Sequence, residues 1–167
     1  MHESMRDLLN AQVGNEFHAA HTYLSMYGYF EAENLPGFAS WMLAQSEEET
    51  QHAMKLFNFL VDRGIAPELP SIPKPTHSFD GPLAVFEAAL AHEQQVTAQI
   101  NALYELAIEH KDYTAQVLLQ WYITEQLEEE KTTGGIVERI KMVEGSRAAL
   151  LLLDAELGVR QGEPQPA

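Results

Sequence analysis

The sequence contains no cysteine among its 167 residues. Disulfides, thiolate nucleophiles, iron–sulfur clusters and thiolate zinc sites are therefore excluded. Any metal that this chain binds must take oxygen or imidazole ligands.

Positively charged residues are scarce: 10 lysines and arginines stand against 25 acidic residues, which gives a formal charge of -15. This balance argues against nucleic acid and anionic membrane surfaces as partners, and it favours cations. Acidic residues also solvate helix surfaces and improve solubility, so charge alone does not separate a cation-binding protein from an ordinary soluble one.

Long apolar runs are missing as well. A membrane-spanning helix needs roughly 20 apolar residues, and the longest apolar run covers only residues 148–153. Residues 1–7 also lack the basic-then-apolar order of a secretory signal. We therefore expect a soluble, cytoplasmic protein with no membrane partner.

What the sequence does contain is apolar residues at helical spacing in four long segments. The 46% hydrophobic content is enough for one core, and we expect one domain over residues 1–167 with a disordered tail from about residue 158. Gly134 and Gly135 predict a bend within the fourth segment. The expected helices cover about residues 4–33, 37–63, 82–110 and 113–143, followed by a short apolar helix over 146–157.

The segment between the second and third helices predicts the topology. Residues 65–80 hold four of the eight prolines and should be extended. A helix of about 27 residues is roughly 40 Å long, and 16 extended residues reach about 50 Å. The connection can therefore return along the whole bundle, which makes the second and third helices parallel. Asp80 is the expected N-cap of the third helix, with Pro82 in its first turn.

Each long helix carries one glutamate on its apolar stripe. Steps of seven residues return to nearly the same side of a helix, and in every stripe such a step meets an acid. The four stripes contain Leu9, Glu16, Tyr23 and Phe30; Met42, Glu49 and Leu56; Phe86, Glu93, Ile100 and Ala107; and Tyr122, Glu129 and Ile136.

Four buried carboxylates would be costly and would repel one another. A bound cation cluster resolves this cost, and four glutamates with one neutral imidazole suit a pair of iron ions. The imidazole is His52, which follows Glu49 by three residues, so both side chains can reach one metal.

Each of these residues also has an ordinary structural interpretation. His52 could be a hydrogen-bonded core histidine, and Tyr23 and Trp121 could be core aromatics. The acidic runs at residues 47–49 and 128–130 could be solvated faces. Chance, however, would have to place an acid on all four apolar stripes.

The residues resemble the prokaryotic non-haem ferritin family over essentially the whole chain. The resemblance implies an all-α, ferritin-like four-helix bundle with a long crossover and a short fifth helix. Its matching elements are Glu16 with Tyr23, residues 49–52 (ETQH), residues 92–94 (HEQ), and Trp121-Tyr122 leading into residues 125–131 (EQLEEEK).

Carried over residue by residue, the resemblance implies a di-iron centre. Glu16, Glu49 and His52 would hold one iron, and Glu49 would bridge to a second iron held by Glu93 and Glu129. Gln126 would be a hydrogen-bonding neighbour, and Tyr23 an electron donor. A third, weaker iron site toward the inner surface would use Glu48, Glu125, Glu128 and Glu129.

The sequence departs from the haem-containing bacterioferritins, which repeat the Glu-x-x-His motif on the fourth helix and place a haem-ligating methionine after the glutamate of the second. Here Thr132 follows Glu129 by three residues, and Thr50 follows Glu49. No haem is therefore expected. Di-iron oxygenases and reductases usually pair two Glu-x-x-His motifs, and this chain has one.

Our hypothesis from the sequence is an iron-storage ferroxidase. It would oxidise Fe(II) with O₂ or peroxide and deposit ferric mineral in a hollow interior. The family resemblance further implies a homo-oligomeric, 24-subunit shell. In that shell the fifth helix would pack around a four-fold axis through Ala149, Leu150, Leu152 and Leu153. Two alternatives stay open: a di-iron enzyme that acts on an organic substrate or peroxide, and a purely structural or partner-binding helical bundle with a protonated acidic core.

Overall fold

The computed structural model describes residues 1–159, and within them the chain forms helices and no strand. The bounds agree with the predicted ones to within one residue at every end. Residues 160–167 of the predicted tail lie outside the described residues, while Gly158 and Val159 close the last helix as a turn. The helices are α1 (Glu3–Ala32), α2 (Pro36–Asp62), α3 (Pro82–Glu109), α4 (Tyr113–Met142) and α5 (Arg147–Leu157).

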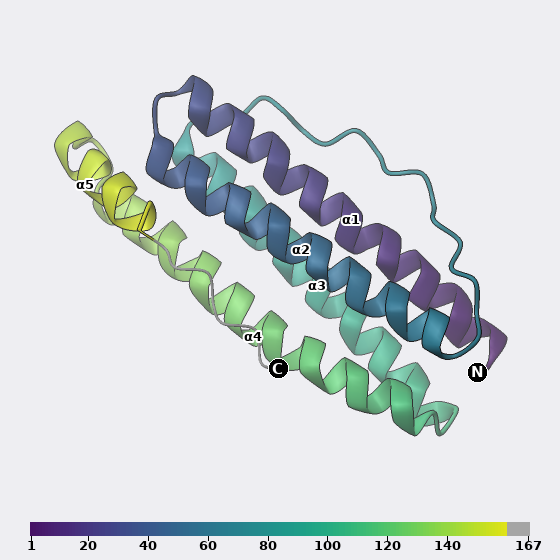
Figure 1. Cartoon of the computed structure of the whole chain (residues 1–167). Helices are drawn as coiled ribbons and strands as arrows, with labels where there is room; N and C mark the ends of the chain where they lie inside the picture. Colours follow the sequence, from purple (N-terminus) through teal and green to yellow (C-terminus); the bar gives the residue numbers. More distant parts are fainter. Residues whose placement is uncertain (160–167) are drawn as a thin grey trace.

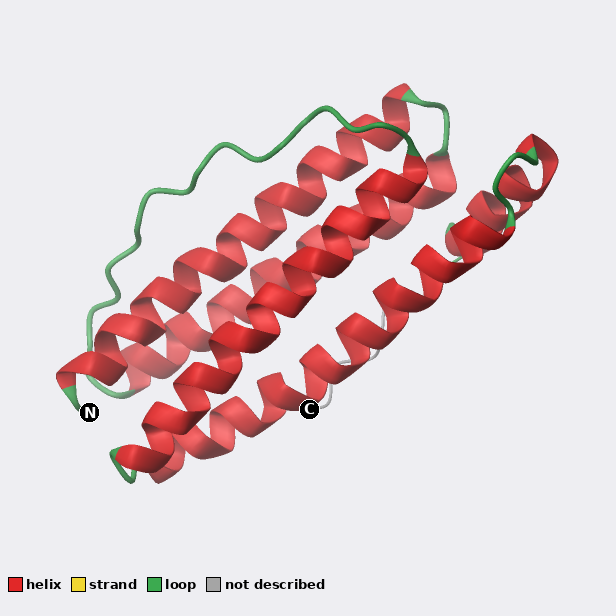
Figure 2. Cartoon of the chain, turned by 180° about the vertical axis from the view of Figure 1, so that it is seen from behind, coloured by secondary structure: helices red, strands yellow, loops and turns green. Residues whose placement is uncertain are grey.

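The four long helices form a bundle of two antiparallel hairpins, α1 with α2 and α3 with α4 (Figure 1). The loop between α2 and α3 runs back along α1, so α2 and α3 are parallel, as predicted (Figures 1 and 2). Ser25 Oγ donates to the carbonyl of Thr76 at 2.7 Å, and Glu68 N–H donates to Asn10 Oδ1 at 2.9 Å. None of the helices over residues 1–159 combines the length and the apolar character needed to cross a membrane.

The start of α3 differs from the prediction. Gly81, not Asp80, is the N-cap, and no side chain caps the helix. The backbone of Gly81 has φ of 101°, a region that glycine enters without steric cost, so a glycine turn replaces the side-chain cap. Pro82 occupies the first turn as expected. Helix α4 runs as one element through Gly134 and Gly135, and a bend there stays a prediction.

The apolar core consists of two clusters, one toward each end of the bundle. The cluster toward the start of α2 is built around tilted and edge-to-face aromatic rings, including Phe30, Phe38 and Phe86. The other cluster includes Leu9, Leu56, Leu60, Ile100 and Leu119. Along each helix, the stripe glutamate lies between residues of the two clusters, so the two apolar ends enclose a polar middle.

Helix α5 packs on the start of α2. Leu153 and Leu157 are buried in the aromatic cluster, and Asp154 accepts the backbone N–H of Phe38 at 2.8 Å. The expected apolar face of α5 was therefore partly wrong. Leu153 faces its own bundle, whereas Leu152 is 73% exposed. The exposed leucines of α5 are Leu151 and Leu152.

Candidate metal centre

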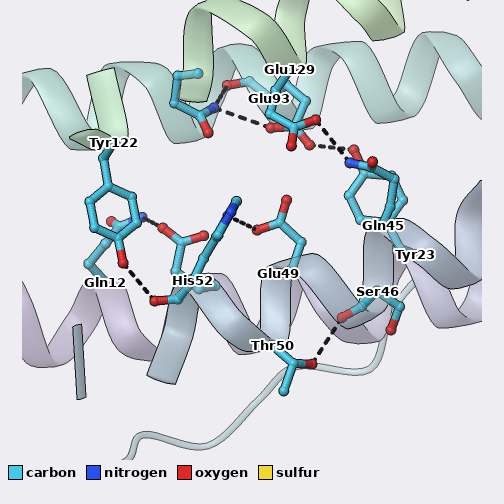
Figure 3. Close-up of polar contacts among 12 residues, drawn as sticks. Gln12, Tyr23, Gln45, Ser46, Glu49, Thr50, His52, Glu93, Tyr122 and Glu129 are labelled. Atoms are coloured by element: carbon cyan, nitrogen blue, oxygen red, sulfur yellow. Dashed lines mark hydrogen bonds and ion pairs between the residues drawn. The ribbon is translucent and has the colours of Figure 1, made fainter. Parts of the chain in front are cut away.

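The four stripe glutamates and His52 are buried in the polar middle of the bundle. All four long helices contribute, and none of the five residues is more than 6% exposed. Figure 3 shows Glu49 and His52 pointing from α2 toward Glu93 and Glu129, which come from α3 and α4. The predicted stripes are therefore confirmed as buried positions: Glu16, Glu49, His52, Glu93 and Glu129.

Three of these residues already form a ligand group. Glu16, Glu49 and His52 place one oxygen or nitrogen each within 4.8 Å of one another. His52 Nδ1 lies 3.2 Å from Glu49 Oε2. This is the trio for which the sequence predicted a shared metal. Glu93 and Glu129 face the trio from the other hairpin but lie outside that 4.8 Å group.

Glutamine side chains donate hydrogen bonds to three of the four buried carboxylates. Gln126 donates to Glu93 Oε2 at 3.2 Å, as the predicted neighbour of the centre. The sequence reasoning missed the other two, which come from α1 and α2. Gln12 donates to Glu16 Oε1 at 2.8 Å, and Gln45 donates to Glu129 Oε2 at 2.9 Å. Both are at most 2% exposed. An amide one helical turn before a stripe glutamate was the signal that could have revealed them.

Tyr23 and Tyr122 anchor the centre through their hydroxyl groups. The Tyr23 hydroxyl donates a short hydrogen bond to Glu93 Oε1, so Tyr23 is more than a packing aromatic. The Tyr122 hydroxyl donates to the backbone carbonyl of His52 at 2.7 Å, which ties α2 to α4 at the ligand.

Trp121 covers the other side of His52. The two rings meet edge to face, with centroids 5.3 Å apart, and the Lys55 ammonium lies 3.8 Å from the centroid of the indole. Burial lowers the pKa of His52 to about 4, and the positive charge of Lys55 acts in the same direction. His52 is thus neutral at physiological pH, the form in which imidazole binds metals.

Burial has the opposite effect on the carboxyl groups. It raises the pKa of Glu16 to about 7, against the hydrogen bonds from Gln12 and Glu49. It raises the pKa of Glu49 well above 4.5, and the negative charges of its neighbours add to this shift. Burial also raises the pKa of Glu93, opposed by hydrogen bonds from Tyr23 and Gln126. Without a cation the cluster therefore holds protons, and a bound cation would take their place.

The residues predicted for a third site are more dispersed. Glu48 and Glu125 are half-buried and form a ligand group with His52, again within 4.8 Å. Glu128 is exposed and belongs to no ligand group among residues 1–159. Glu129 lies in the buried centre. The structure thus brings together two of the predicted residues and adds His52, which the prediction did not include in this site.

The donor set fits iron. It combines carboxylate oxygens with one neutral imidazole, a set suited to iron and without the sulfur ligands that select soft metals. A four-helix bundle with inward-facing glutamates and a Glu-x-x-His motif is the architecture of the ferritin-like carboxylate proteins. This fold and site define the class.

Comparison with known proteins identifies the family. The model of the ferritin-like domain matches residues 6–143. The non-haem ferritin of Campylobacter jejuni is 40% identical over 147 residues, which are 88% of each chain. The chain belongs to the ferritin family, and its non-haem relatives imply that it binds iron.

Two solved structures give the same picture. The open pore ferritin of the archaeon Archaeoglobus fulgidus is 42% identical, with a TM-score of 0.95 over 96% of this chain and 99% of that one. A closed form of the same ferritin, engineered by site-directed mutagenesis, also has a TM-score of 0.95 and covers 98% of this chain and 99% of that one. These likenesses confirm the predicted fold and support assembly into an oligomer.

Proposed function

We propose that the buried centre is a di-iron ferroxidase site that oxidises Fe(II) and supplies ferric iron for storage. The observation that carries this proposal is the cluster of four buried glutamates and one neutral histidine, with pKa values displaced by burial in both residue types. Such a cluster is unfavourable when empty and favourable around cations.

In this proposal Glu16, Glu49 and His52 hold one Fe(II), and Glu93 and Glu129 hold the second. Glu49 bridges the two ions, which its central position between the ligand trio and the opposite hairpin supports. Tyr23 contacts Glu93 directly and is placed to supply an electron during oxidation by O₂ or peroxide. No haem takes part.

Glu48 and Glu125 form a third, weaker iron site on the way out of the centre. Its support is that these half-buried carboxylates share His52 with the buried trio. Glu128 is exposed on the same helix as Glu125, where it can complete the site once iron is bound. Oxidised iron would pass through this site toward the storage cavity.

The storage shell is a further part of the proposal. The ferritin neighbours support an oligomer, and a hollow shell of 24 copies of this single-domain chain would hold the mineral. Leu151 and Leu152 of α5 supply exposed apolar surface for contacts between copies. A cytoplasmic location stays a prediction of the sequence.

The test is anaerobic Fe(II) loading of the assembled protein, followed by air. We expect two tightly bound Fe(II) per chain and fast oxidation followed by absorbance. Glu49→Ala should abolish the fast phase, and Glu47→Ala, on the exposed side of the same helix, should leave it unchanged.

Size measurement separates the alternatives. A large shell that retains its size in Glu49→Ala supports storage, whereas a monomeric or dimeric wild type contradicts it and favours a di-iron enzyme. Absence of any tight Fe(II) binding would favour the structural bundle with a protonated core.

A further inference from the structure

A pocket of about 420 Å³ lies at the end of the bundle farthest from α5. There the start of α1 meets the corner between α3 and α4. Among its lining side chains, two are cationic (Arg63 and Lys111), two are imidazoles (His2 and His110), and one is anionic (Asp112). This is unusual in a chain with a formal charge of -15. The residues that matter are His2, Arg63, His110, Lys111, Asp112 and Thr114.

The one acidic side chain of the pocket, Asp112, is already paired with an arginine. Arg63 donates to both carboxylate oxygens of Asp112, at 2.9 and 3.1 Å, and also contacts the hydroxyl of Thr114. Asp112 Oδ1 also accepts the N–H of Ala115 at 3.2 Å and so caps α4. Its hydrogen bond with Arg63 lowers the pKa of Asp112. Lys111 forms no ion pair with any residue of the described range, so its charge is uncompensated.

Two histidines add hydrogen-bond donors. His2 Nδ1 accepts the backbone N–H of Ser4 as the cap of α1, so in the neutral ring the proton lies on Nε2. Ser4 Oγ lies 2.8 Å from His2 Nδ1 and 3.1 Å from His110 Nε2. In that tautomer His110 Nε2 donates to Ser4 Oγ and Ser4 Oγ donates to His2 Nδ1, and no residue among 1–159 accepts a hydrogen bond from His2 Nε2–H.

The same two rings are poorly arranged for a metal ion. They are stacked, with centroids 3.9 Å apart and an interplanar angle of 13°. Nitrogen lone pairs lie in the ring plane, so two parallel stacked imidazoles do not converge on one cation. The pocket therefore offers hydrogen-bond donors and positive charge in place of a metal site.

We propose that this pocket binds a phosphate-type oxyanion. Lys111 supplies charge, His2 Nε2–H supplies a directed donor, and Arg63 holds the corner in place through its ion pair with Asp112. The volume also admits an organic group on the phosphate. The site lies at the end of the bundle, apart from the carboxylate centre, so it does not depend on iron binding.

The test is isothermal titration of the assembled, chelator-treated, full-length protein with inorganic phosphate at low ionic strength. A second titration with glycerol 3-phosphate asks whether free phosphate or a phosphate ester binds better. We expect saturable binding near one per chain for at least one of the two probes.

Variants identify the residues responsible. Lys111 has φ of 53°, so Lys111→Asn removes the charge with a side chain that tolerates this backbone. We expect it to weaken binding at least tenfold. Lys74→Asn, an exposed lysine of the long loop, should have no effect, and Fe(II) oxidation should be unchanged in both.

Two results would overturn the proposal. One is the absence of saturable binding of both probes to the wild type. The other is equal weakening by Lys74→Asn and Lys111→Asn, because that would show general attraction to charge and no defined pocket. Circular dichroism of Lys111→Asn confirms that the helices are intact.

Discussion

Gln12 acts on the metal centre through Glu16. Its amide donates to Glu16 Oε1 at 2.8 Å, and this hydrogen bond lowers the pKa of Glu16 against the effect of burial. We expect Gln12→Leu to raise that pKa further, so that protons compete more strongly with Fe(II). Outer partners of metal ligands are worth about tenfold or more in affinity. Anaerobic Fe(II) titration at pH 6.5 and 8 should show a loss of about tenfold at the lower pH that shrinks at the higher pH.

The control for Gln12→Leu is Gln94→Leu, which changes an exposed glutamine next to the proposed ligand Glu93. It should bind Fe(II) as the wild type does. A Gln12→Leu protein with unchanged affinity at both pH values would show that the amide only fills space.

The raised pKa of Glu16 also leads us to expect that the stability of the iron-free protein varies with pH. Burial raises this pKa to about 7 in the folded chain, from about 4.5 in the unfolded chain. The folded state therefore keeps a proton that the unfolded state releases. The stabilisation by protonated Glu16 is complete below pH 4.5 and is lost as the pH rises through about 7. The difference is worth on the order of 3 kcal/mol. Added divalent metal should restore the loss.

The measurement is denaturant unfolding of chelator-treated wild type and Glu16→Gln at pH 5 and pH 8. Glu16→Gln should gain stability relative to the wild type as the pH rises. Comparing the two proteins cancels His52, whose lowered pKa of about 4 gives a contribution that is complete above 6.5 and is lost as the pH falls through about 4. Parallel pH profiles of the two proteins would contradict the assignment.

At the scale of helices, Asp154 connects α5 to α2. Helix α2 has no side-chain cap of its own, and Asp154 Oδ1 accepts the N–H of Phe38 in its first turn. A Cβ on Gly37 would lie 1.7 Å from the carbonyl oxygen of Asp154, so the helices meet backbone to backbone. We expect Asp154→Ala to cost about 1–2 kcal/mol, the usual value of a helix cap.

Thermal unfolding tests this capping role. Asp154→Asn keeps an acceptor oxygen and should lose less than Asp154→Ala. Gly37→Ala should be at least as damaging as Asp154→Ala, because the backbones must separate. Equal melting temperatures for Asp154→Ala and the wild type would rule out the cap as a stabilising contact.

The helices, the crossover and the burial of the stripe glutamates were predictable because they depend on local periodicity and composition. Heptad steps placed Glu16 and Glu93 correctly, since a buried stripe repeats within one helix. Contacts between distant residues were not predictable. The cap of α2 by Asp154 joins positions that are 116 residues apart in the chain. The hydrogen bond from Gln45 to Glu129 joins α2 of one hairpin to α4 of the other. The predicted Asp80 cap was wrong because the backbone of Gly81, with its positive φ, forms the turn that begins α3.

At the scale of the whole molecule, all five proposed ligands come from a single chain, whereas storage of ferric mineral would need a shell of many chains. Oxidation and assembly should therefore be separable. Leu151 and Leu152 are 57% and 73% exposed on α5, away from the buried centre. A double Leu151→Glu, Leu152→Glu variant should dissociate the shell and still fold, because Leu153 and Leu157 keep α5 on its bundle.

Light scattering and Fe(II) oxidation, measured on the same samples, test this separation. The double variant should shift to small species that oxidise two Fe(II) per chain quickly and then precipitate ferric iron, since no cavity retains it. Leu127→Glu, at a leucine 74% exposed on α4, is the matched control and should stay assembled. If small species of the double variant lost the fast oxidation, the centre would need a second chain, and the intrachain site built from the four helices would be incomplete.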